Sequence, residues 1–190
     1  MRTAERQVLI DRRGEKGLIE RPVWRILRPG SDAKGGHPLN EKLIKLAAAG
    51  LGSGYAPLAP GTAGSLVGIP LYLAFSAFPG PLWLLTLAAF TCLAWYLADG
   101  AERLFGRKDA QCIVIDEIAG LQWTLFLVEP TLLRIAAGFV LFRLFDVVKP
   151  FPARRFQERL PGGYGVVADD LAAALYAAAL LRVLVRFGVV

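Results

Sequence analysis

The sequence predicts an all-α protein, an integral membrane helical bundle in which several apolar helices are short or form hairpins. First, 55% of its 190 residues are hydrophobic and its mean hydropathy is +0.46, whereas a typical soluble domain is roughly 45–50% apolar. Second, these residues gather in long Leu- and Ala-rich runs without alternation, which favours helices over strands. Third, short turns rich in Pro and Gly separate the runs, as expected between antiparallel helices.

Residues 1–40 are a basic arm that we expect to be loosely structured, because they have no sustained apolar period. Half of the 22 Lys and Arg residues lie in residues 1–46, and the net charge of the chain is +6. The arm lacks the apolar core and cleavage site of a signal peptide. A basic segment attracts nucleic acid or an anionic membrane. Beside so much apolar sequence, and without regularly spaced aromatic residues, we predict a membrane partner and no nucleic acid.

Residues 41–190 form the predicted membrane-embedded domain. Asn40 can cap a short helix over residues 41–49, and the Gly- and Pro-rich residues 52–65 predict a loop. Five apolar runs follow. A spanning helix needs about 20 residues, with a lower limit near 17, so the sequence leaves open which runs cross the bilayer and which enter it only as hairpins. The runs are residues 66–78, 82–98, 113–128, 132–148 and 171–190.

The distribution of Lys and Arg predicts the orientation in the membrane, because cytoplasmic loops carry an excess of both. With the basic arm in the cytoplasm, the turns at 79–81 and 129–131 face outside and contain no Lys or Arg. The two longer loops between runs then face the cytoplasm, and both are basic. Arg182 and Arg186 lie deep in the last run, which leaves three interpretations: a tilted interfacial helix, a contact with a partner, or snorkelling to the surface.

Five carboxylates lie at the cytoplasmic ends of the apolar runs under this topology. An ionised group beside apolar sequence is costly unless it is paired or binds a metal. Carboxylate oxygens suit Mg²⁺, which usually also contacts a substrate phosphate. We therefore predict a Mg²⁺ site at the cytoplasmic mouth, formed by Asp116, Glu117, Asp146, Asp169 and Asp170.

Cations and a Gly-rich loop at the same level predict a phosphate site. Arg143, Asp146 and Lys149 recur every three positions, so they share one helix face. Cationic side chains and free backbone N–H groups are what a phosphate needs. The loop is not a Walker motif, because no Lys precedes its serine. The candidate phosphate-binding residues are Pro60, Gly61, Thr62, Gly64, Ser65, Arg143 and Lys149.

Each charged group also has a purely structural interpretation. Asp170 can cap a helix, and Asp116 with Glu117 can be a first-turn pair that the helix dipole favours. Arg143 and Asp146 can form an ion pair three residues apart on one helix. The convergence of all these groups at one membrane level favours a functional site.

The order and spacing of these motifs resemble the phosphatidylglycerophosphatase A family over about residues 40–180. The most specific part is RLFDVVKPFP at residues 143–152, and the other matching segments are residues 52–66, 116–120 and 162–170. The chain departs from the family pattern at Ala174, where the family often has Gly, and in a longer arm before residue 40.

The resemblance implies a Mg²⁺-dependent, multi-pass phosphatase of the bacterial inner membrane. It would remove the terminal phosphate of phosphatidylglycerophosphate at the cytoplasmic face, giving phosphatidylglycerol. The five carboxylates would hold the metal, Arg143 and Lys149 would neutralise charge on the phosphoryl group, and Thr62, Gly64 and Ser65 would hold the phosphate or glycerol. Two points stay open: whether water or a carboxylate attacks phosphorus, and whether the chain forms a homo-oligomer.

Two other functions remain as alternatives. Asp99-Gly100 resembles the opening of the CDP-alcohol-type lipid transferase motif, although the later Gly and Asp positions do not follow. The chain could also be a non-enzymatic membrane transporter or scaffold whose buried charges form an ion path. Cys- and His-based phosphatase chemistry is excluded, because Cys92 and Cys112 open no phosphate loop and His37 is the single histidine.

Overall fold

The computed structural model describes residues 8–10, 16–18, 38–107, 110–151, 153, 155 and 163–190. The chain divides into two units, Met1–Ala33 and Lys34–Val190. In the first unit, strands β1 (Val8–Ile10) and β2 (Lys16–Leu18) pair in antiparallel register, with Val8 opposite Leu18. The structure thus adds a short hairpin to the predicted basic arm. The other residues of that arm, up to residue 37, lie outside the described residues.

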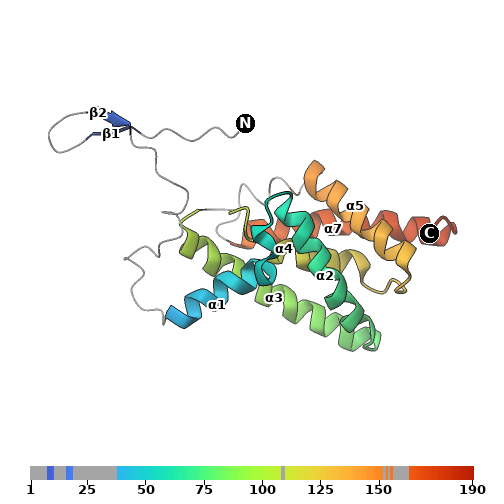
Figure 1. Cartoon of the computed structure of the whole chain (residues 1–190). Helices are drawn as coiled ribbons and strands as arrows, with labels where there is room; N and C mark the ends of the chain where they lie inside the picture. The colour runs from blue at the N-terminus through green and yellow to red at the C-terminus, as the bar shows by residue number, and fades with distance from the viewer. Residues whose placement is uncertain are drawn as a thin grey trace. The chain divides into compact units, whose positions relative to one another are not determined.

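The second unit is helical, and each predicted apolar run contributes to one of its helices (Figure 1). The all-α prediction is therefore confirmed for this unit. The elements are α1 (Pro38–Ala48), the 3₁₀ helix η2 (Gly50–Tyr55), α2 (Pro60–Ser76), α3 (Gly80–Phe105), α4 (Ile115–Leu125), α5 (Leu132–Val148) and α7 (Gly163–Arg186).

Several predicted boundaries were wrong. Asn40 lies inside α1 and does not cap it, because the helix begins at Pro38. The predicted loop over residues 52–65 is a 3₁₀ turn followed by the first residues of α2. Pro60 stands at the first position of α2, where its fixed φ favours a helix and its missing N–H loses no hydrogen bond. The last helix begins at Gly163, eight residues before the apolar run that predicted it.

The short helix α4 lies in the middle of the second unit and packs against α2, α3, α5 and α7 (Figure 1). Nine of its eleven residues are buried. Helix α7 packs against α3, α4 and α5, and α1 packs on α3. An eleven-residue helix spans about 17 Å, so α4 serves as a core around which the longer helices are arranged.

The turn after α2 and the turn after α4 meet at one end of the unit, which we call the turn end. The Tyr72 hydroxyl donates to the carbonyl of Val128 at 2.7 Å. The ring of Trp83 lies 6.0 Å from that of Tyr72 and 5.3 Å from that of Phe126. Arg182 donates from Nη2 to the Phe126 carbonyl at 2.7 Å. Arg182 therefore has a hydrogen-bond partner within the chain, and the three interpretations of Arg182 and Arg186 stay predictions.

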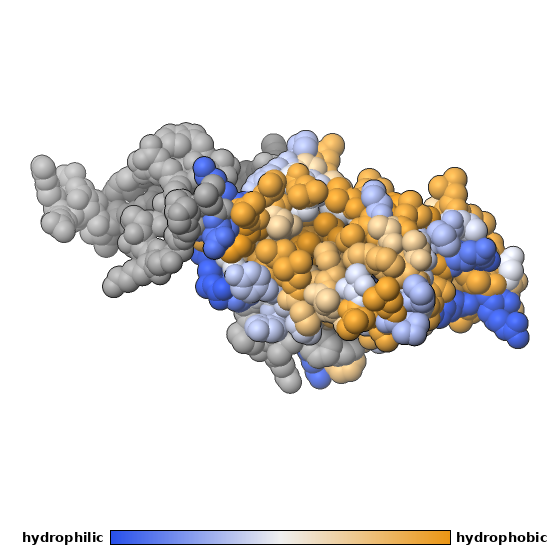
Figure 2. Space-filling model, turned by 90° about the horizontal axis from the view of Figure 1, so that it is seen from below, coloured by the Kyte–Doolittle hydropathy of each residue, from blue (hydrophilic) through white to orange (hydrophobic). Residues whose placement is uncertain are grey.

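Apolar side chains remain exposed over much of the second unit. In Figure 2 hydrophobic residues cover most of its visible face, and the strongly hydrophilic ones lie toward the two ends of that face. Within the described residues, α3 alone is long and apolar enough to cross a membrane, and 33% of its apolar window is buried. The predicted multi-pass arrangement therefore stays a prediction.

Candidate active site

The first turn of α4 carries Asp116 and Glu117. Its position is fixed from α1, because the N–H of Val114 donates to the carbonyl of Ala48 at 2.9 Å just before the helix begins. The predicted first-turn placement of the two acids is confirmed. The N-terminus of a helix favours negative charge, yet Asp116 is 4% exposed, so most of its hydration is lost.

Helix α7 brings Asp169 and Asp170 to the same region, and both are almost fully buried. Because α7 begins at Gly163, Asp170 lies inside the helix and the helix-cap interpretation is wrong. Gly120 of α4 leaves room for the Phe142 ring of α5 and for the backbone of α7. A Cβ at that position would lie 2.5 Å from the Phe142 ring and 3.3 Å from the carbonyl oxygen of Asp170.

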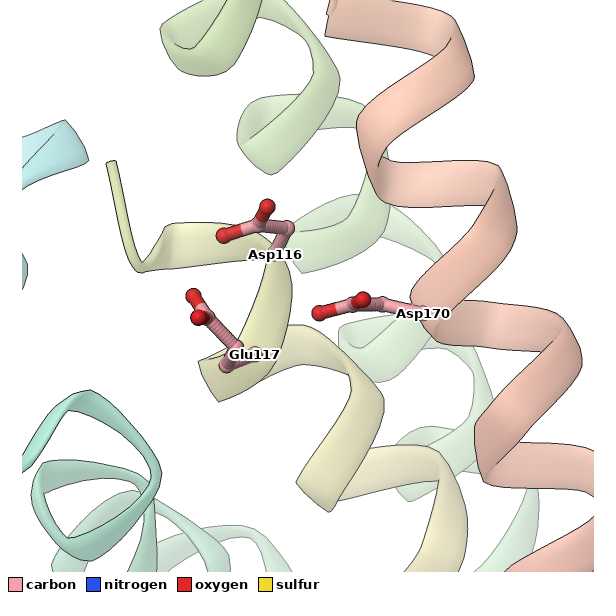
Figure 3. Close-up of side chains that lie close together, drawn as sticks. All are labelled: Asp116, Glu117 and Asp170. Atoms are coloured by element: carbon pink, nitrogen blue, oxygen red, sulfur yellow. The ribbon is translucent and has the colours of Figure 1, made fainter. Parts of the chain in front are cut away.

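Asp116, Glu117 and Asp170 form a three-carboxylate cluster. Each offers one oxygen, and these oxygens all lie within 4.8 Å of one another. Figure 3 shows the two acids of α4 and Asp170 of α7 turned toward the same space. Among the described residues, Oε2 of Glu117 and Oδ2 of Asp170 are buried without a hydrogen-bond partner. Buried carboxylates with unsatisfied oxygens are strongly unfavourable unless a cation compensates them, so the donor set fits a hard divalent cation.

The electrostatics of the cluster favour protons or a cation. Burial raises the pKa of Glu117 well above its ordinary value, and the charges of Asp116 and Asp146 add to the rise while Arg143 opposes it. Burial likewise raises the pKa of Asp170, and the neighbouring carboxylates raise it further. A bound cation would reverse this balance, because it stabilises the ionised form of each ligand.

Two basic residues face the acids: Arg143 in α5, and Lys149 directly after it. Arg143 lies 2.7 Å from Oδ2 of Asp146 and 3.9 Å from Oε1 of Glu117. The predicted ion pair between Arg143 and Asp146 is confirmed, and the same guanidinium also reaches the three-carboxylate cluster. The Lys149 ammonium lies 2.5 Å from Oδ2 of Asp169.

The ion pair between Lys149 and Asp169 is nearly dehydrated on the acidic side. Burial alone lowers the pKa of Lys149, but its hydrogen bond and charge interaction with Asp169 raise it on balance. Burial raises the pKa of Asp169 to about 7, although the bond to Lys149 acts in the opposite direction. Oδ1 of Asp169 has no hydrogen-bond partner in the part of the chain that the structure describes. The pair therefore keeps a buried oxygen available for a ligand.

The N-terminus of α2 touches the acids through Gly61. A Cβ at this glycine would lie 2.3 Å from Oε1 of Glu117 and 3.0 Å from Nη1 of Arg143. The first N–H groups of a helix have no partner within it and favour anions. Pro60 has no N–H, so the first donors of α2 belong to Gly61 and Thr62.

Gly64 and Ser65 make packing and backbone contacts near the start of α2. A Cβ at Gly64 would lie 2.5 Å from Cβ of Val114. Ser65 is fully buried, and its hydroxyl donates to the Gly61 carbonyl at 2.9 Å. Their assignment to phosphate binding stays a prediction, and these contacts favour a role in packing α2 against the start of α4.

A family model for phosphatidylglycerophosphatase A matches residues 46–185 of the chain. The chain belongs to the phosphatidylglycerophosphatase A family. The resemblance noted in the motifs is thereby confirmed, and membership of a phosphatase family favours a hydrolase over the transferase and transporter alternatives. No solved structure matches the chain.

Curated relatives of the chain extend this match. The Escherichia coli phosphatidylglycerophosphatase A is 38% identical over 138 residues, which cover 72% of this chain and 80% of the relative. The Haemophilus influenzae phosphatidylglycerophosphatase A is 40% identical over 136 residues, covering 70% and 83%. A Bacteroides thetaiotaomicron relative, named for a proposed phosphatidylinositol-3-phosphatase activity, is 38% identical over 143 residues, covering 70% and 88%.

The structure sorts the acids predicted for this family member into two kinds. Three form the cluster, whereas Asp146 pairs with Arg143 and Asp169 pairs with Lys149. Sequence reasoning assigned no role to Gly120, although a glycine inside an apolar helical pattern can signal close packing against a neighbouring element. It also gave no role to Tyr176 of α7, whose hydroxyl donates to the Phe151 carbonyl just after Lys149. Nothing in the helical spacing of that residue indicates this contact.

Proposed function

We propose that this protein is a Mg²⁺-dependent phosphatase that converts phosphatidylglycerophosphate to phosphatidylglycerol and inorganic phosphate. The observation that carries the proposal is the convergence of three carboxylates, Arg143 and the N-terminus of α2 at one place. Anionic groups beside cationic ones fit a metal and a phosphate bound together. The names of the family and of two relatives support this lipid as the substrate.

Asp116, Glu117 and Asp170 are the residues that would hold the cation. When bound, Mg²⁺ would supply Lewis-acid activation of the phosphoryl group and of the attacking nucleophile. Asp146 and Asp169 would act beside it by holding Arg143 and Lys149 in place.

The other residues would bind the phosphate and stabilise the charge that develops on it. Arg143 can contact a phosphoryl oxygen while it remains paired with Asp146, because a guanidinium carries five N–H donors. The N–H groups of Gly61 and Thr62 point out of the first turn of α2 and can donate to the same group. Lys149 adds a second positive charge from the end of α5. Donors fixed before the reaction lower its barrier most in a site that excludes water.

We place this site at the cytoplasmic face of the bacterial inner membrane. Support comes from α3, whose apolar window is mostly exposed, and from the many large apolar side chains exposed on α2, α5 and α7. Arg103 and Arg107 lie at the end of α3 that is nearest in sequence to Asp116, as the positive-inside rule requires of a cytoplasmic end.

Labelling with a membrane-impermeant maleimide tests this orientation. In a chain that carries Cys92→Ser and Cys112→Ser, we expect Gln111→Cys to react only after the cells are opened. We expect Pro130→Cys, an exposed position at the turn end, to react in cells whose outer membrane alone is permeabilised. The reverse pattern would contradict the orientation, and equal labelling of both sites in intact cells would contradict membrane insertion.

The activity is tested with the purified full-length chain in detergent. We expect phosphate release from phosphatidylglycerophosphate that disappears in a chelator and returns with Mg²⁺. Alanine at Asp116, Asp146 or Lys149 should abolish release while the protein still folds. A soluble phosphomonoester shows whether the lipid tail is required. Wild-type rates in these variants would refute the site, and the absence of phosphate release from any lipid phosphate would refute the function.

Phosphatidylinositol 3-phosphate is a second candidate substrate, favoured by the name of the Bacteroides relative. Both lipids present a terminal phosphate on a glycerolipid headgroup, so the same site can treat either. Parallel measurements of kcat/KM on the two lipids decide between them. A transfer of the phosphatidyl group from a CDP-lipid, with no phosphate released, would instead support the lipid transferase alternative.

A further inference from the structure

Lys149 has a backbone conformation that must be held by its surroundings. It follows α5 with φ 47° and ψ 66°, in the left-handed region. A residue with a Cβ pays a steric penalty there, of about 1–2 kcal/mol. Its N–H donates to the carbonyl of Phe145 at 2.8 Å, which closes the helix, and the chain then turns so that the N–H of Ala153 donates to Pro150 at 2.8 Å. The direction of the lysine side chain depends on this turn.

Tyr176 of α7 holds the turn from outside. Its hydroxyl donates to the carbonyl of Phe151 at 2.7 Å. Its ring stacks on the ring of Phe145, with centroids 5.7 Å apart and an angle of 29° between the planes. One side chain therefore contacts the chain both before and after Lys149.

Tyr176 and the acidic partner of Lys149 lie on the same helix. Asp169 precedes Tyr176 by seven residues, which is about two turns, so both side chains leave α7 on one face. Asp169 holds the ammonium group of Lys149, and Tyr176 holds the backbone that follows it. Helix α7 therefore contacts both the ammonium group of Lys149 and the backbone two residues after it.

We propose that Tyr176 is a positioning residue for Lys149. The proposal rests on the function proposed above, in which Lys149 stabilises charge on the phosphoryl group. The hydroxyl of Tyr176 fixes the Phe151 carbonyl, this fixes the turn, and the turn keeps Lys149 in the left-handed conformation that directs its ammonium group to Asp169. Such a residue acts on kcat more than on KM, because it orients a group whose interaction grows in the transition state.

Tyr176→Phe tests the proposal, since it keeps the stacked ring and removes only the hydroxyl. In the full-length protein we expect kcat to fall about fivefold to tenfold, with KM within about twofold, as for the loss of one oriented hydrogen bond. Hydrogen exchange in a peptide covering residues 149–155 should become about tenfold faster. The matched control is Tyr96→Phe, because the Tyr96 hydroxyl is exposed and has no hydrogen-bond partner among the described residues. It should match the wild type in both measurements.

Three results would overturn the proposal while leaving the proposed function intact. The first is an active wild type with an equal kcat in Tyr176→Phe. The second is a lower kcat with unchanged exchange in residues 149–155. The third is faster exchange throughout the chain together with a lower Tm, which would make Tyr176 a residue of general stability. A wild type that releases no phosphate would refute the proposed function itself, and the exchange experiment would still report whether Tyr176 holds the turn.

Discussion

The two ends of the helical unit differ in how their buried polar groups are satisfied. At the turn end, the polar groups of Tyr72 and Arg182 donate to backbone carbonyls, and aromatic rings fill the space between the helices. Among the described residues there, the buried group without a partner is the neutral N–H of Trp83. At the other end, which we call the site end, Glu117 and Asp170 keep buried oxygens that no group in the described residues satisfies. A buried polar group lowers stability unless it is fully satisfied. The penalty is far larger for a carboxylate than for a neutral N–H. The turn end therefore mainly stabilises the fold, and the site end depends on a ligand.

Backbone strain is distributed in the same uneven way. The described non-glycine residues with positive φ are Leu51, Ala59, Leu127 and Lys149. Ala59 directly precedes α2, and Lys149 directly follows α5, so two of them stand where helix ends meet the candidate site. Leu51 lies in η2, beside the segment that starts α4, and Leu127 alone belongs to the turn end. Strain at helix ends around a site is expected where geometry matters more than stability.

The largest expected effect comes from Asp170→Asn, which removes a charge from the site end at constant shape. Phosphate release should fall by about 10³-fold or more, because a metal ligand supports several kcal/mol of transition-state stabilisation. The Tm of the metal-free protein should nevertheless rise, because a buried carboxylate with a raised pKa is replaced by a neutral amide. Rates and thermal unfolding in a chelator test both statements. A large loss of Tm would contradict the view that the site end is destabilising.

Gly61→Ala should have the next largest effect on the rate of phosphate release. The added methyl group would lie 2.3 Å from Oε1 of Glu117, so either the acid or the start of α2 must move. A displacement of this kind in an active site costs about 100-fold in rate. The matched control at the turn end is Gly80→Ala, where the nearest side-chain atom would be 3.5 Å away. Equal kcat/KM values for the two variants would contradict the assignment of the start of α2 to the site.

The pH dependence of stability should also reflect the buried acids of the site end. In the unfolded chain, Asp and Glu lose their protons near pH 4, whereas the folded chain keeps them up to the raised pKa values, about 7 for Asp169. This contribution to stability is present below about pH 4 and is lost as the pH rises through the folded pKa values. The Tm of the metal-free protein should thus fall between about pH 5 and pH 8.

Mg²⁺ should reverse that trend. The cation binds the ionised carboxylates, so its stabilising effect should be larger at about pH 8 than at about pH 5.5. Thermal unfolding at the two pH values, with Mg²⁺ or with a chelator, measures the effect. Asp170→Asn serves as the control and should show little response to Mg²⁺. A metal-free Tm that increases with pH would contradict the assigned direction of the pKa values.

Local patterns predicted which residues matter better than they predicted how those residues are used. The helical runs, the ends at which their charges gather, and the ion pair of Arg143 with Asp146 all follow from periodicity. The selection of Asp116, Glu117 and Asp170 from five acids does not, because it depends on how closely α7 approaches α4. The absent side chain of Gly120 leaves room there for the Phe142 ring and for the Asp170 backbone, a feature of packing that the pattern of a single helix does not contain.

The contact of Tyr72 at the turn end could not be predicted from the sequence pattern either. Its substitution gives the smallest effect that we expect. Its hydroxyl lies in an apolar run and is buried, and only the folded chain brings the Val128 carbonyl within 2.7 Å of it. Tyr72→Phe removes the donor and leaves that carbonyl unsatisfied, which costs about 1–3 kcal/mol. We expect a Tm lower by roughly 2–12 °C for a chain of this size, with kcat and KM unchanged in the folded protein. A loss of activity at unchanged Tm would mean that the two ends are coupled, because a change near the far end of α2 from Gly61 would then act on the reaction itself.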